Sequence, residues 1–211
     1  MALRVLVSGA GGRMGREVVK AVYDAADMEL VGAVDPCHRN EDAGVLAGLG
    51  EIGILVLSDL SEALTALRPQ VVVDFTGPRV VMANARLVLG AGVNLVIGTT
   101  GLGEEDLQEL DSRARMRGLG VVHAPNFALG AILMMRFARE AARFFPGVEI
   151  IELHHDQKKD APSGTAIKTA EMIQETWQGA GGERLLDEEL KVDGARGGDF
   201  KGIHIHSVRL P

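Results

Sequence analysis

Short apolar runs alternate with longer helical patterns along the first part of the chain, and this alternation restricts the fold more than any other feature of the sequence. Val71–Val73 and Leu95–Ile97 are apolar at every position. Such runs are typical of strands that helices cover on both faces. Strands and helices that alternate in this way form a parallel, doubly wound sheet. We therefore expect an α/β fold that begins with a Rossmann-type sheet.

The apolar runs also set the expected bounds of the elements. The strands are expected at Leu3–Ser8, Glu29–Asp35, Ile54–Leu57, Val71–Thr76, Asn94–Thr99 and Gly120–Ala124, and the helices from the glycine cluster to Ala26 and over Ser61–Leu67, Val80–Leu89 and Glu104–Arg117.

Beyond Asn126 the pattern changes to that of a second, α+β domain with an open mixed sheet. Its expected elements are a helix over Ala128–Phe145, a strand over Val148–His154, a polar loop over His155–Ser163, a helix over Thr165–Trp177, turns at Gly179–Gly182 and Gly194–Gly198, and a strand over Gly202–Leu210. The predicted domains are therefore residues 1–127, which would bind a dinucleotide, and residues 128–211.

Composition excludes several classes of protein. The 22 Lys and Arg residues against 29 Asp and Glu residues give a formal charge of −7, which argues against a nucleic-acid binder. The single cysteine, Cys37, cannot form an intrachain disulfide. No apolar stretch is long enough for a membrane helix, and the N-terminus lacks the layout of a signal peptide. We expect a soluble cytoplasmic protein.

The loop after the first expected strand has the composition of a dinucleotide-binding turn. Gly9, Gly12 and Gly15 are three residues apart, and Gly11 adds a fourth glycine. Met14 occupies the last glycine position of the usual G-x-G-x-x-G pattern, but a strand precedes the loop and a helix follows it. Small residues let a pyrophosphate approach the backbone and the helix N-terminus. A glycine-rich turn without a ligand is the alternative.

An acidic residue supports the interpretation as a cofactor loop. Asp35 ends the second expected strand, where a carboxylate accepts hydrogen bonds from the adenosine ribose. A carboxylate at this place repels a 2′-phosphate and therefore favours NADH, although NADPH stays possible because His38 and Arg39 follow. The alternative is that Asp35 only caps the next turn. Further cofactor contacts are expected after the fifth and sixth strands, at Gly98, Thr99, Thr100, Ala124, Pro125, Asn126 and Phe127.

A second cluster of reactive side chains follows the strand Val148–His154. His154 and His155 can act as acids or orienting donors near neutral pH, and Lys158 adds positive charge. Gly164 and Thr165 open a helix whose N–H groups can bind an anion. The loop therefore offers a proton source beside a place for carboxylates. A solvated basic turn with Ser163 as the helix cap would explain the same residues.

The stretch Glu152-Leu153-His154-His155-x-x-Lys158-x-Asp160-Ala161-Pro162-Ser163-Gly164-Thr165-Ala166 resembles the signature of the bacterial dihydrodipicolinate reductases, also called 4-hydroxy-tetrahydrodipicolinate reductases. Gly9–Gly15, Asp74–Thr76, Val96–Gly101 and Ala124–Phe127 resemble other motifs of that family, in the same order along the chain. The resemblance implies an NAD(P)H-dependent oxidoreductase of diaminopimelate and lysine biosynthesis.

The resemblance also implies roles for individual residues. His154 and Lys158 would be catalytic, and His155, Gly164 and Thr165 would bind the dicarboxylate substrate. The cofactor would be held by Gly9, Ala10, Gly11, Gly12, Arg13, Met14, Asp35 and the residues named above after the fifth and sixth strands. The second domain would bind substrate and assemble a homotetramer.

The chain departs from the family pattern in two ways. Pro36 stands where many members have a basic residue after the acid, which favours NADH. Family chains also continue past the strand Gly202–Leu210, so the second domain is expected to be truncated at Pro211. Ile203, Ile205, Val208 and Leu210 would then lie near an open sheet edge.

Three other functions would use parts of the same pattern. His154 and His155 with His204 and His206 could in principle bind zinc, but polar alternation on a half-exposed strand explains the second pair as well, so no metal is expected. A dinucleotide sensor without catalysis is the main alternative. A semialdehyde dehydrogenase needs a nucleophilic cysteine, and Cys37 lies beside the expected adenosine pocket instead.

Overall fold

The structure, a computed structural model, describes residues 2–124, 126–177 and 189–211. The chain divides into two compact units, Met1–Pro125 and Asn126–Pro211. No helix among the described residues is long and apolar enough to cross a membrane.

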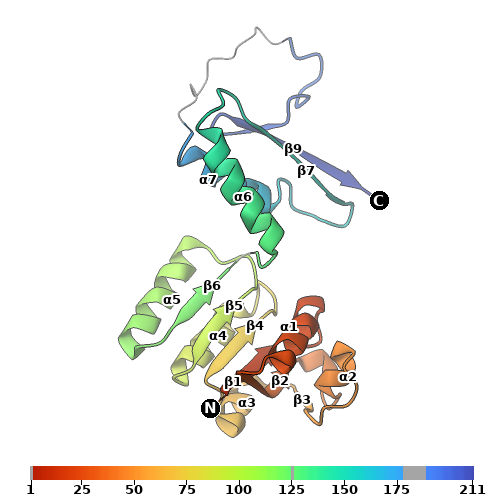
Figure 1. Cartoon of the computed structure of the whole chain (residues 1–211), viewed down its shortest axis with the longest axis vertical. Helices are drawn as coiled ribbons and strands as arrows, with labels where there is room; N and C mark the ends of the chain where they lie inside the picture. Colours follow the sequence, from red (N-terminus) through yellow and green to blue (C-terminus); the bar gives the residue numbers. More distant parts are fainter. Residues whose placement is uncertain (1, 125, 178–188) are drawn as a thin grey trace. The chain divides into compact units, whose positions relative to one another are not determined.

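The first unit is built on a parallel sheet with the strand order β3-β2-β1-β4-β5-β6 (Figure 1). Its strands are β1 (Leu3–Ser8), β2 (Met28–Val34), β3 (Val56–Leu57), β4 (Val71–Asp74), β5 (Asn94–Ile97) and β6 (Val121–His123), and its helices are α1 (Arg13–Asp24), α2 (Ala43–Ala47), α3 (Leu60–Leu67), α4 (Val81–Gly90) and α5 (Glu104–Arg117), with a short 3₁₀ helix at Pro36–His38. The expectation of a Rossmann-type sheet is confirmed.

Helices cover both faces of this sheet because successive strand residues point to opposite sides. Val5 and Val7 pack into one core with residues of α1 and α2. Leu6, which lies between them, packs into a second core with residues of α3, α4 and α5. The strands are therefore apolar at consecutive positions, as the runs in the sequence indicate.

Two short elements of this unit lie outside the expected set. They are the 3₁₀ helix and α2, and a carboxylate caps each of them. Asp35 accepts a hydrogen bond from Cys37 N, and Asp42 accepts hydrogen bonds from Gly44 N and Val45 N. Elements this short carry too little hydrophobic periodicity to be detected in the sequence.

In its described residues, the second unit pairs two helices with a mixed sheet of order β7-β9-β8. Its elements are α6 (Leu129–Ala142), β7 (Glu149–His155), α7 (Gly164–Gln174), β8 (Gly198–Phe200) and β9 (Ile203–Leu210). β7 and β9 are parallel, and β8 and β9 are antiparallel. Residues of α6, α7 and the sheet form one core, which includes Ala142, Ala170 and Ile173. The expected mixed sheet is confirmed.

The position of β9 corrects one expectation. β9 lies between the other two strands, and Ile203 and Ile205 are buried, so they do not lie at an open edge. β8 pairs only with the first half of β9, and Val208 and Leu210 pair only with β7. The expected turn at 194–198 overlaps the start of β8, and the expected turn at 179–182 lies outside the described residues.

Candidate active site

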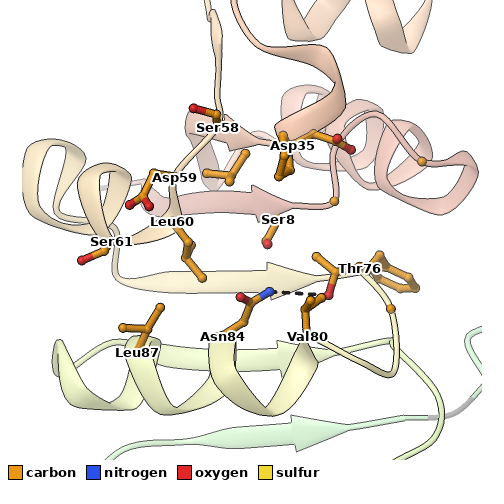
Figure 2. Close-up of a pocket in the computed structure, with 16 residues that line it drawn as sticks. Ser8, Asp35, Ser58, Asp59, Leu60, Ser61, Thr76, Val80, Asn84 and Leu87 are labelled. Atoms are coloured by element: carbon orange, nitrogen blue, oxygen red, sulfur yellow. Dashed lines mark hydrogen bonds between the residues drawn. The ribbon is translucent and has the colours of Figure 1, made fainter.

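A cavity of about 460 Å³ opens at the carboxyl ends of the parallel strands of the first unit (Figure 2). Its lining consists of Ser8, Gly9, Gly12, Val34, Asp35, Pro36, Ser58, Asp59, Leu60, Ser61, Phe75, Thr76, Gly77, Val80, Asn84 and Leu87. These residues end or follow β1, β2, β3 and β4, or lie in or next to α3 and α4. The strand order reverses between β1 and β4, and ligands of doubly wound sheets bind at that point.

The loop between β1 and α1 brings backbone to the wall of this cavity. Gly9 has a φ of +80°, and a Cβ there would lie 2.5 Å from the carbonyl oxygen of Phe75. A side chain is therefore excluded at Gly9. Gly12 is the N-cap of α1, so the first N–H groups of the helix are next to the cavity lining.

Other predicted residues of this loop lie differently. The side chain of Ala10 is buried in the core beside α1, which leaves its backbone as the part that could meet a ligand. Arg13 and Met14 begin α1 and line a separate surface hollow with Arg16 and Lys20. The ring of His38 lies against Gly11, where a Cβ would be 1.9 Å from His38 Cδ2. The absence of a side chain at Gly11 therefore has a structural reason that the sequence did not indicate.

Asp35 makes two contacts to backbone. One carboxylate oxygen accepts from Gly11 N at 3.0 Å, and the other accepts from Cys37 N at 2.9 Å. The capping role is therefore real, and Asp35 also lines the cavity. A carboxylate has about four acceptor sites, so these two bonds leave capacity for ribose hydroxyls.

A buried carboxylate, Asp74, organises the ends of β4 and β5. It accepts from Thr76 Oγ1 at 2.7 Å, from Thr99 Oγ1 at 2.9 Å and from Asn84 Nδ2 at 2.9 Å. The two threonines donate to Asp74, so toward a ligand their oxygens can only accept. Thr76 and Asn84 line the cavity (Figure 2), and the sequence gives no indication of Asn84.

The predicted contacts after β5 and β6 are divided between the two units. Gly98 lies against the ring of Phe75, Thr99 is buried and Thr100 is exposed. Ala124 ends the described part of the first unit, and Pro125 lies outside the described residues. Asn126 and Phe127 belong to the second unit, where Asn126 Oδ1 accepts from Ala128 N at 2.8 Å.

The second unit has a cavity of about 450 Å³ that both α6 and α7 line together with β7. Its polar lining is Asn126, Glu149, Glu152, His154, Ser163, Thr165 and Thr169. Asn126 Nδ2 lies 3.4 Å from Thr165 Oγ1. His154 and Thr165, predicted from one motif, therefore do line one cavity. Gly164 and Thr165 are the first residues of α7, and Ser163 caps it by accepting from Ala166 N at 3.2 Å.

The loop between β7 and α7 holds Lys158 by an ion pair. Lys158 Nζ donates to both carboxylate oxygens of Asp160, at 2.8 and 2.9 Å, and this pairing holds the pKa of Asp160 below its usual range. His155 and Lys159 are exposed. Sequence reasoning missed Arg209, whose guanidinium donates to the carbonyl oxygen of Asp160 at 2.6 Å.

The histidines do not gather into a metal site in the described part of the chain, which contains no group of three His, Cys, Asp or Glu side chains suited to hold an ion. His206 Nε2 contacts Glu149 Oε2 at 2.8 Å, and Arg196 contacts the other oxygen of Glu149. This pairing at one end of β7 explains His206 without a metal.

Comparisons with known proteins give one consistent result. Residues 3–127 match the family described as dihydrodipicolinate reductase, N-terminus, and residues 130–211 match dihydrodipicolinate reductase, C-terminus. The 4-hydroxy-tetrahydrodipicolinate reductase of Desulfitobacterium hafniense is 53% identical over 210 residues, which are 99% of this chain and 78% of that protein. The Moorella thermoacetica enzyme of the same name is 51% identical over 212 residues, with the same shares covered.

A solved structure agrees with these matches. The dipicolinate-bound dihydrodipicolinate reductase from Paenisporosarcina sp. TG-14 is 43% identical and superposes with a TM-score of 0.79. The alignment covers 100% of this chain and 80% of that one.

Proposed function

The chain belongs to the dihydrodipicolinate reductase family, and on this premise we propose that it converts 4-hydroxy-tetrahydrodipicolinate, NAD(P)H and a proton to tetrahydrodipicolinate, NAD(P)⁺ and water, in diaminopimelate and lysine biosynthesis. The match of both halves of the chain to one family is the observation that supports this most strongly. The dipicolinate named for the Paenisporosarcina protein is a planar ring with two carboxylates, which is the chemical class of the proposed substrate.

The first unit would hold the cofactor, which supplies a hydride when bound. The cavity at the strand ends fits an extended ligand, because the close packing at Gly9 brings backbone to its wall and Gly12 places a helix N-terminus there. Asp35 would accept from the ribose. Thr76 and Thr99, whose hydroxyl protons are directed to Asp74, would accept from the carboxamide or a hydroxyl of the ligand.

The second unit would bind the substrate and deliver the proton. The N–H groups of Gly164 and Thr165 at the start of α7 would hold a carboxylate. His154 would face the ring through Nε2, because its Nδ1 contacts Glu152. Negative charge develops on the substrate nitrogen as hydride reaches carbon, and the ammonium group of Lys158 would stabilise that charge and donate the proton. His155 would add a further polar contact.

The choice between the two cofactors follows from Asp35. Its carboxylate is held at the cavity wall by Gly11 N and Cys37 N, and a 2′-phosphate at that place would meet a negative charge. We predict that NADH binds at least as tightly as NADPH. Calorimetric titration of the protein with each cofactor measures this. A tenfold preference for NADPH, about 1.4 kcal/mol, would contradict it.

The assay for the proposed activity is the oxidation of NADH with substrate generated by the preceding synthase. Turnover that needs both the synthase and this chain supports the proposal. Binding of NADH without any turnover would instead favour the dinucleotide sensor. Assembly as a homotetramer through the second unit and a cytoplasmic location stay predictions, and analytical ultracentrifugation tests the first of them.

A further inference from the structure

One buried carboxylate touches three parts of the proposed substrate site. Glu152 lies in the middle of β7 and is only 9% exposed. Its Oε1 accepts from Ser163 N at 3.3 Å and from a terminal guanidinium nitrogen of Arg209 at 2.9 Å. Its Oε2 contacts Nδ1 of His154. Glu152 and His154 lie on one face of β7 because they are two residues apart on a strand.

The partners of Glu152 determine its ionisation. Burial by itself raises the pKa of a carboxyl group, but hydrogen bonds from Arg209, Ser207 and His154 more than offset it and lower the pKa of Glu152 to about 2. The charged groups that face this carboxylate are His154 from its own strand and Arg209 from β9. Glu152 is therefore ionised at neutral pH and can only accept hydrogen bonds.

An acceptor at this place fixes the proton of the imidazole. His154 Nδ1 must carry the proton that it donates to Glu152, which leaves Nε2 as the nitrogen that can meet a ligand. We propose that Glu152 is the positioning residue of this site, which sets the tautomer of His154 and ties it to the two segments that carry Ser163 and Lys158. The proposal rests on the proposed function, for which His154 is a catalytic residue.

The link to Lys158 runs through Arg209. The same guanidinium donates to the carbonyl oxygens of Asp160 and Lys158, at 2.6 and 3.4 Å. Arg209 is thus held by Glu152 on one side and holds the loop with Lys158 on the other. The link to the carboxylate site is direct, because Ser163 caps α7. All these groups belong to the second unit.

The variant Glu152→Gln tests the tautomer because its amide has one donor end and one acceptor end. The amide oxygen is expected at the Oε1 position, since Ser163 N and Arg209 can only donate. The amide NH₂ group then faces His154. Of the partners of Glu152, the Ser207 hydroxyl can donate or accept, so it is compatible with either end of the amide. The amide NH₂ that faces His154 needs an acceptor at Nδ1, so the proton of His154 moves from Nδ1 to Nε2.

Two measurements on the full chain read out this change. The ¹⁵N chemical shifts of the His154 ring should report the Nδ1–H tautomer in the unaltered protein and the Nε2–H tautomer in Glu152→Gln. The kcat should fall at least about 10-fold in the variant, since positioned acids contribute about 10² to 10⁴, while KM changes far less. In serine proteases the same change of an orienting carboxylate to an amide lowers kcat by about 10⁴.

Glu140→Gln is the control. Glu140 lies on α6 of the same unit and pairs with Arg143 at 3.2 Å, and neither residue lines the cavity or belongs to the proposed catalytic set. This variant should leave the His154 shifts and kcat unchanged. Unchanged His154 shifts in folded Glu152→Gln would overturn the proposal. The expected tautomer shift in a protein without reductase activity would instead contradict the proposed function alone.

Discussion

At the residue scale, the two adjacent lysines of the loop after β7 differ in their contacts and in their exposure to solvent. Lys158 is paired with Asp160 and has a side chain that is 23% exposed. Lys159 is exposed, and the family resemblance gives it no role. Substituting each lysine in turn therefore compares two residues that have the same charge and adjacent positions in the chain but different contacts.

We predict that Lys158→Ala lowers kcat by at least about 10²-fold, because a positioned acid contributes about 10² to 10⁴ in rate. The affinity for NADH should barely change, since the cofactor loop belongs to the other unit. Steady-state kinetics combined with separate cofactor titrations measures both quantities. Lys159→Ala is the control and should behave like the unaltered protein. If Lys159→Ala removed activity while Lys158→Ala kept it, the assignment of the proton donor would be wrong.

Some contacts of the site cannot be predicted from the sequence. The motif around His154 marks the loop, yet it gives no indication that Arg209, which lies 49 residues beyond Asp160, holds the backbone there. That contact depends on the parallel pairing of β7 with β9, in which His154 stands opposite Arg209. Glu152 could have been found, because strand periodicity places it on the face of His154.

At the element scale, the long apolar runs determine the strands, and polar side chains determine where they end. β4 and β5 were expected to reach Thr76 and Thr99, but they end at Asp74 and Ile97. The side chain of Asp74 accepts from both threonine hydroxyls and from the backbone N–H of Thr76, so that N–H is bonded to a side chain and not to a neighbouring strand. The sequence predicts the presence and order of such elements well, because core burial sets them, and predicts their ends less well, because individual hydrogen bonds set those.

The loop around α2 depends on a single carboxylate. Asp42 Oδ1 accepts from Gly44 N, Val45 N and Ile52 N, and its Oδ2 accepts from Gly53 N at 2.8 Å. These backbone donors keep the pKa of Asp42 below its usual range even though burial alone would raise it. The side chain therefore bonds to both ends of the loop, whereas an ordinary N-cap bonds only to the first N–H groups of its helix.

We predict that Asp42→Ala lowers the urea concentration at the midpoint of unfolding, because it removes the cap of α2 and the acceptor that both ends of the loop share. The variant leaves four backbone donors without their acceptor. Urea unfolding followed by circular dichroism measures the loss. Glu51→Ala, an exposed acidic residue of the same loop, is the control and should change stability by less than about 0.5 kcal/mol. Equal losses in both variants would show that the network of Asp42 contributes nothing.

At the scale of the whole molecule, the two units carry different parts of the proposed chemistry. The glycine loop and Asp35 belong to the first unit, and His154 and Lys158 belong to the second. The sequence predicts this division because the helix–strand alternation stops after Asn126. It cannot predict how side chains from distant strands meet within one unit, since strand register decides that.

Among the described residues, each unit contains a carboxyl group whose pKa arginine contacts lower to about 2. In the first unit, hydrogen bonds from Arg86 and then Arg113 lower the pKa of Glu109 to about 2. In the second unit, the partners described above lower the pKa of Glu152 to about 2, despite its burial. Both groups have an ordinary pKa of 4.5, which applies to the unfolded chain.

The difference between the folded and unfolded pKa values determines how the stability of the protein changes in acid. A carboxyl group with a lower pKa in the folded state stabilises that state fully above the unfolded pKa, and the contribution is lost as pH falls through the folded value. Both units should therefore lose stability as pH falls from 4.5 toward about 2. Thermal unfolding at a series of pH values checks this. Glu152→Gln should lower the melting temperature at neutral pH and flatten its decline in acid. A variant whose decline between pH 4.5 and 2 matched that of the unaltered protein would show that Glu152 is not the group that titrates.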